Sequence, residues 1–121
     1  MKQIDTDYVH INFLDDKTVL VEVREGVEID YDKASNAIRL INDKMKSDYG
    51  IISNRKADYS IVPHQVYDVL NSIENLKAIA IVVTKRTFLP LTSEQKFFNK
   101  KLEAFETIQE AHKWILNALS V

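Results

Sequence analysis

The sequence contains no cysteine. Disulfide bonds, thiolate nucleophiles and cysteine-ligated zinc or iron–sulfur sites are therefore excluded. Only two glycines and two prolines occur among 121 residues, so there is little material for linkers. Phosphate loops and dinucleotide fingerprints need several closely spaced glycines, which Gly26 and Gly50 do not provide. We therefore expect a single domain over residues 1–121.

Long apolar runs are also missing. The longest, residues 78–83, has the length of a buried strand, whereas a membrane-spanning helix needs roughly 20 apolar residues. The first ten residues contain no apolar signal region. A formal net charge of −2 gives no global attraction to nucleic acid or to anionic membranes. We expect a cytoplasmic protein with no membrane insertion and no nucleic-acid partner.

The apolar fraction of 45% and the charged fraction of 28% are typical of a globular domain. Apolar and polar residues alternate over residues 9–14 and again over 19–24, with a polar turn between them. This pattern predicts a β-hairpin. Asp30 then offers a helix N-cap, and apolar residues follow at helical spacing, which predicts a helix at 31–46.

The second half of the chain alternates between strand and helix patterns. A strand is expected at 49–53 and a helix beginning at Pro63. Residues 78–84 are apolar on both faces, which is typical of a covered parallel strand. A capping box at residues 92–95 predicts a short third helix, and a strand is expected at 104–106. Thr107 and Glu110 form the capping box of the last helix. The alternation predicts an α/β fold with a mainly parallel central sheet.

This layout resembles a known family. The resemblance rests on four segments: the leading hairpin, EIDYDKA at 28–34, LKAIAIVV at 76–83 and LEAFETIQEAHKWIL at 102–116. Over residues 8–120 the chain is similar to bacterial STAS domains of the SpoIIAA-like kind. The resemblance implies a superhelix of β–α units with about four helices mostly on one face of the sheet. It also implies a cytosolic regulator without enzymatic activity that binds a partner protein.

Some members of that family are switched by phosphorylation of a serine, which lies at the start of the helix after the third strand. In those members the serine lies in an Asp-Ser-Ser/Ala-Gly stretch. The corresponding segment here reads ADYSIVPHQ at residues 57–65. It contains Ser60, but the motif is absent and Pro63 occupies the helix start. Ser60 is named as the candidate phosphorylation site on the resemblance alone.

The candidate metal ligands and acid–base groups are scattered. His10, His64 and His112 are the only histidines, and no two have the spacing of a helical metal site. The carboxylate pair at 15–16 suits a polar turn, and the pair at 30 and 32 suits helix capping. We therefore expect no catalytic residue, no metal and no cofactor.

Basic residues follow two of the expected parallel strands. Arg55 and Lys56 come after one, and Lys85 and Arg86 come after the next. Both strands should end at the same carboxyl edge of the sheet, where open α/β sheets bind ligands. One interpretation is an edge that receives an anion or an acidic partner. The other is that surface loops simply carry solvated charges.

A dense apolar cluster lies around Pro90. It contains Phe88, Leu89, Phe97 and Phe98. These side chains either pack a short helix onto the sheet or form an exposed patch for a protein partner, a second copy or a lipid.

Two hypotheses for function follow. The first is a non-enzymatic cytosolic regulatory or protein-interaction module of STAS type. The alternative is a domain that binds an anionic or lipid-like small molecule between the basic edge and the apolar cluster.

Overall fold

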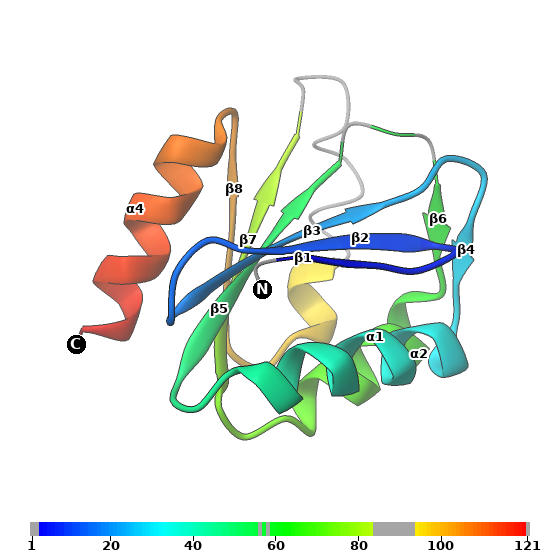
Figure 1. Cartoon of the computed structure of the whole chain (residues 1–121), viewed down its shortest axis with the longest axis horizontal. Coiled ribbons are helices and arrows are strands. Elements are labelled where there is room, and N and C mark those ends of the chain that lie inside the picture. Colours follow the sequence, from blue (N-terminus) through cyan, green and yellow to red (C-terminus); the bar gives the residue numbers. More distant parts are fainter. Residues whose placement is uncertain (1–2, 56, 58, 84–93, 121) are drawn as a thin grey trace.

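The computed structural model describes residues 3–55, 57, 59–83 and 94–120. Its strands form a six-stranded sheet in the order β1-β2-β3-β5-β7-β8 and a two-stranded sheet of β4 and β6 (Figure 1). The strands are β1 (Gln3–Asp5), β2 (Val9–Phe13), β3 (Thr18–Val23), β4 (Glu28–Ile29), β5 (Tyr49–Asn54), β6 (Ser60–Ile61), β7 (Leu76–Val82) and β8 (Lys101–Phe105). The helices are α1 (Tyr31–Lys44), α2 (Pro63–Asn71) and α4 (Ile108–Leu119), with a short helical segment at residues 94–97.

The pairing of the strands confirms a mixed α/β fold. β2 and β3 form the expected antiparallel hairpin, and β1 adds an antiparallel edge strand that the sequence analysis did not include. The pairs β3–β5, β5–β7 and β7–β8 are all parallel. Both β5 and β7 are therefore interior strands, and the apolar run at residues 78–84 predicted this position for β7. No helix in the described part of the chain is long and apolar enough to cross a membrane.

The sheet carries helices on both faces. One core cluster joins α1, α2 and Phe98, just after residues 94–97, to one face of the sheet. A second cluster joins α4 to the opposite face, with Ala111 and Ile115 against Ile52 and Ala80. The expectation that the helices lie mostly on one face thus does not extend to α4, which stands apart from α1 and α2 in Figure 1. The small side chains on this face of β7 leave room for α4 to pack closely.

Local capping signals set the helix starts. Asp30 accepts a hydrogen bond from the Lys33 amide at 3.1 Å, and Thr107 accepts one from the Glu110 amide at 3.1 Å. Pro63 is the first residue of α2, where its missing N–H costs nothing. Strand ends were predicted less well: β8 starts three residues before the expected strand, because Lys101 pairs in register with Ala78 of β7.

Gly50 allows the closest approach between α4 and the sheet. A Cβ atom at this position would lie 2.6 Å from Cγ2 of Ile115 and 3.2 Å from the carbonyl oxygen of Ala78. Ile115 is fully buried, so its side chain has little room to move. A glycine within a strand often marks such a contact.

We expect Gly50→Ala to lower the free energy of unfolding by about 1–3 kcal/mol, the usual cost of overpacking a core. Urea denaturation followed by circular dichroism measures it. The double variant Gly50→Ala, Ile115→Ala should lose less stability than the sum of the losses in the two single variants, because the side chain that clashes with the added Cβ atom is then gone. A Gly50→Ala variant as stable as the wild type would contradict this packing.

A polar contact links α4 to the turn of the hairpin. Oδ2 of Asp15 lies 2.7 Å from Nε2 of His112, and Oδ1 accepts the Lys17 amide hydrogen at 2.8 Å. Burial alone would raise the pKa of Asp15, but the hydrogen bonds from Lys17 and His112 outweigh it, so the pKa lies below its usual value. The ionised form of Asp15 is therefore favoured by folding.

Asp15→Ala should lower the free energy of unfolding by about 0.5–1 kcal/mol at neutral pH, as is usual for partly exposed pairs. The folded pKa lies below the unfolded value of 3.8. The stabilisation by ionised Asp15 is therefore fully present above pH 3.8 and is lost as the pH falls through the folded pKa. Urea unfolding at a series of pH values should show the difference between variant and wild type shrinking only in acid. Asp16→Ala, at the exposed neighbouring position, is the matched control. A difference that shrinks instead between neutral pH and about pH 5 would contradict the linkage.

Candidate binding pocket

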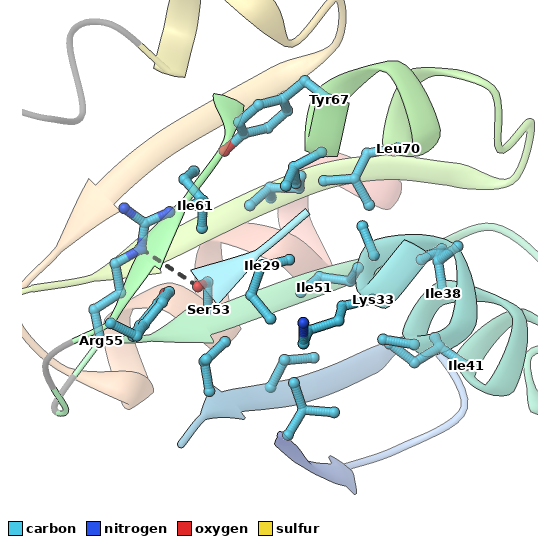
Figure 2. A pocket seen from close by; sticks show the side chains of 18 residues that line it. Ile29, Lys33, Ile38, Ile41, Ile51, Ser53, Arg55, Ile61, Tyr67 and Leu70 are labelled. Atoms are coloured by element: carbon cyan, nitrogen blue, oxygen red, sulfur yellow. Dashed lines mark hydrogen bonds between the residues drawn. The ribbon is translucent and has the colours of Figure 1, made fainter. Parts of the chain in front are cut away.

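The layer of α1 and α2 does not close completely onto the sheet. Between them lies a cavity of about 110 Å³, which we call the α1–α2 pocket (Figure 2). Its walls are mainly aliphatic, with Val21 and Ile51 from the sheet and Ala34 and Ala37 from α1. The pocket therefore lies within the larger of the two cores and is suited to apolar groups.

The two-stranded sheet holds together the amino ends of the helices beside the pocket. β4 runs directly into α1 and β6 runs into α2, and the two strands pair in parallel. Ile29 and Ile61, which pair in this sheet, both line the pocket. The amide of Tyr31 also donates to the side-chain oxygen of Gln65 at 3.0 Å, which joins the first turns of α1 and α2. These contacts fix the separation of the two helices at this end of the pocket.

A few polar side chains interrupt the apolar lining. Lys33 enters from α1, Ser53 from β5, and Arg55 from just beyond the end of β5. Tyr59 and Tyr67 complete the polar part of the wall. Figure 2 shows Lys33, Ser53 and Arg55 among the lining side chains, with a bond of 3.5 Å from Arg55 Nε to Ser53 Oγ.

Arg55 belongs to a buried polar triad with Glu94 and Tyr67. Its two terminal nitrogens bind the two carboxylate oxygens of Glu94, and the Tyr67 hydroxyl donates to the same carboxylate at 2.5 Å. The side chains of Arg55 and Glu94 are 17% and 3% exposed. Burial would lower the pKa of Arg55, but the carboxylate outweighs it and the pKa is raised. Burial, with the nearby negative charge, also raises the pKa of Tyr67. At neutral pH Arg55 is a cation and Tyr67 a neutral donor.

The triad joins three distant parts of the chain. Arg55 follows β5, Tyr67 is in α2, and Glu94 begins the helical segment at 94–97. Because the guanidinium and the carboxylate neutralise each other, this group is internally satisfied. Arg55 and Tyr67 of the triad line the pocket, whereas Glu94 is not among the lining residues and pairs with the charge of Arg55.

The structure describes one of the four predicted basic-edge residues. Arg55 is turned inward, and the carboxylate that it binds is that of Glu94 in the same chain. Lys56, Lys85 and Arg86 lie outside the described residues. Convergence of the four at the edge of the sheet therefore stays a prediction.

The predicted apolar cluster divides between core and surface. Phe98 is buried, and its ring centroid lies 5.8 Å from that of Tyr67. Phe97 is 41% exposed. Phe88 and Leu89 lie outside the described residues. Phe98 thus packs the helical segment onto α2, whereas Phe97 presents an apolar ring to solvent.

The remaining candidates take local roles. Ser60 is the exposed first residue of β6, and its phosphorylation stays a prediction. His64 is exposed near the start of α2.

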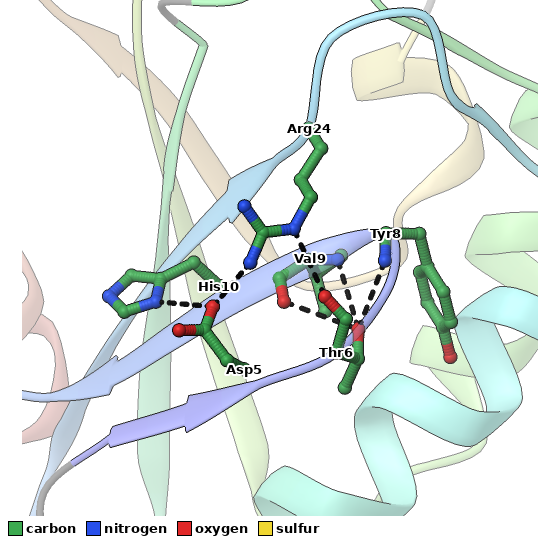
Figure 3. A network of polar contacts seen from close by, with 6 residues as sticks. All are labelled: Asp5, Thr6, Tyr8, Val9, His10 and Arg24. Carbon is green, nitrogen blue, oxygen red and sulfur yellow. Dashed lines mark hydrogen bonds and ion pairs between the residues drawn. The ribbon is translucent and has the colours of Figure 1, made fainter.

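His10 belongs to a polar network that joins β1 to the hairpin. It contacts Asp5 at 2.9 Å, and Arg24 donates to the same carboxylate at 2.5 Å (Figure 3). The hydrogen bond from His10 is the largest cause of the lowered pKa of Asp5. Among the described residues, no group of three acidic or histidine side chains could hold a metal ion.

Sequence reasoning missed Lys33, Ser53, Tyr67 and Glu94 as members of the site. One signal was available for Ser53, which lies two residues after Ile51 and therefore on the same inward face of β5. A polar side chain on such a face calls for a partner or a ligand. Glu94 is 39 residues from Arg55, and no local pattern connects them.

Comparisons with protein-family models, with curated proteins and with solved structures gave no match to this chain. The geometry of the pocket is therefore the basis on which a function can be proposed.

Removing one partner of the buried ion pair should be costly. We expect Arg55→Met to lower the free energy of unfolding by about 3–5 kcal/mol, because the Glu94 carboxylate is left buried without its cation. The double variant Arg55→Met, Glu94→Leu should recover much of this loss. Urea denaturation of the single and double variants measures the coupling.

Arg24→Met is the matched control for this pair. The side chains of Arg24 and Asp5 are 47% and 62% exposed. Removing this ion pair should therefore lower the free energy of unfolding by less than about 1 kcal/mol. Equal costs for Arg24→Met and Arg55→Met would contradict the assignment of a buried pair.

Proposed function

We propose that this chain is a non-enzymatic binding domain that takes up a small apolar or amphipathic molecule in the α1–α2 pocket. The observation that carries the proposal is the cavity of about 110 Å³ between the helices and the sheet. Protein interiors are close-packed and leave few voids larger than a water molecule. A ligand that fills the pocket would supply the van der Waals contacts that its lining atoms lack.

The volume limits the ligand. Engineered apolar cavities of about 150 Å³ stay dry and bind benzene. A cavity of about 110 Å³ therefore suits a small ring or a short alkyl chain. The aliphatic lining excludes strongly polar groups from the inner part of the pocket, because nothing there would replace their hydrogen bonds to water.

The resemblance to STAS domains gives a second candidate, a cytoplasmic regulatory module that binds a partner protein. The strand order favours it, since β2, β3, β5, β7 and β8 are neighbours in chain order. A superhelix of β–α units produces this order. A module of this kind would use its surface and leave the pocket empty. Uptake of a small apolar probe therefore distinguishes the two candidates.

Benzene and hexan-1-ol are suitable probes. Each should raise the Tm of the wild-type protein in a concentration-dependent manner, because a ligand that binds only the folded state stabilises it by mass action. Ala37→Leu adds about three methylene groups to a side chain that lines the pocket. This variant should fold and lose most of the Tm shift.

Ala118→Leu is the matched control. It makes the same change in α4, on the opposite face of the sheet, and should keep the wild-type response to both probes. If neither probe shifts the Tm of the wild type, or if Ala37→Leu responds as strongly as Ala118→Leu, the pocket is not the binding site.

A further inference from the structure

The charged residues that line the α1–α2 pocket are all positively charged. They are Lys33 and Arg55, and no aspartate or glutamate is among the lining residues that the structure describes. The Arg55 charge is met by Glu94. The Lys33 ammonium forms no ion pair with another described residue. Its charge favours ionisation of Asp30, but that carboxylate is exposed and already caps α1. Lys33 is thus the cation of the pocket that a ligand can engage.

Ser53 provides a hydrogen-bond donor in the same pocket. Its Oγ accepts the long bond of 3.5 Å from Arg55 Nε, which leaves the hydroxyl hydrogen to donate. Lys33 reaches the pocket from α1 and Ser53 from β5, so the two polar groups come from its two opposite walls (Figure 2). An ammonium and a hydroxyl donor together suit an anionic oxygen.

We infer that the ligand is a short-chain carboxylic acid, with its alkyl group among the aliphatic residues and its carboxylate bound by Lys33 and Ser53. This inference rests on the proposed function, because it names the ligand of the same pocket. The apolar walls supply the driving force for uptake of the alkyl chain. The head group supplies selectivity, since an amine of equal length would be repelled by the Lys33 ammonium and an alcohol would forgo a charge-assisted bond.

Three probes with the same six-carbon chain test the inference on the full chain: hexanoate, hexan-1-ol and hexylamine. Their dissociation constants are measured at neutral pH by NMR titration. Hexanoate should bind about tenfold more tightly than hexan-1-ol, the factor that corresponds to a charge-assisted hydrogen bond of about 1.5 kcal/mol. Hexylamine should bind more weakly than either.

Two variants then locate the head group. Lys33→Gln should remove the tenfold preference for hexanoate while it leaves the affinity for hexan-1-ol within about twofold. Ser53→Ala should reduce the preference in part. Lys44→Gln, at the exposed end of the same helix, is the matched control and should keep the full preference. The Tm of each variant without ligand shows that it is folded.

The outcomes separate this inference from the proposed function. If hexan-1-ol binds in the pocket as tightly as hexanoate, or if Lys33→Gln keeps the preference, the carboxylate assignment is wrong and apolar binding stands. If none of the three probes binds, the proposed function fails as well.

Discussion

The parallel pairing of β5 with β7 sets how the two faces of the sheet are covered. A parallel pair lies inside the sheet and needs cover on both faces, because its side chains are apolar on both. On one face this cover is α4, which comes close because Gly50 and the alanines of β7 present little bulk. On the other face the cover is α1 with α2. The two layers are built differently, and the pocket lies beneath the layer of α1 and α2.

The contacts that fix the positions of α1 and α2 lie near the ends of these helices. The two-stranded sheet of β4 and β6 joins the amino ends of the helices, and the Arg55–Glu94–Tyr67 triad fixes α2 to the end of β5. Between these fixed points, small side chains of α1 such as Ala34 and Ala37 face the sheet. The pocket is the space that these small residues leave. It results from where the layer is anchored and how little bulk faces the sheet there.

The triad is better understood as a positioning device than as a source of stability. A buried ion pair gains little over well-packed apolar side chains, because both charges must first be removed from water. Its geometry is nevertheless demanding, since the carboxylate of Glu94 must meet both the guanidinium and the phenol. Such a group favours one placement of the segment at 94–97 over others. Because Arg55 is paired with Glu94, Lys33 is the cation of the pocket that has no ion-pair partner among the described residues.

Local sequence patterns were sufficient to predict the main helices and strands and the α/β class of the fold. Periodicity and caps are local, so Asp30, Pro63 and Thr107 set helix starts that the structure confirms. The apolar run at residues 78–83 predicted an interior parallel strand for the same reason. β1 and β6 were missed because strands of three and two residues carry too little pattern to be recognised.

The candidate site, in contrast, depends on contacts between segments that are far apart in the chain. The four residues of the predicted basic edge were grouped by topology, yet Arg55 turned inward, because Glu94, 39 residues away, supplies its counter-charge. The placement of α4 on the opposite face and the cavity beneath α1 were equally beyond reach. A helix stripe shows that a face is buried and not which side of the sheet buries it. A cavity is a sum of side-chain volumes from elements far apart in sequence, and no local pattern contains that sum.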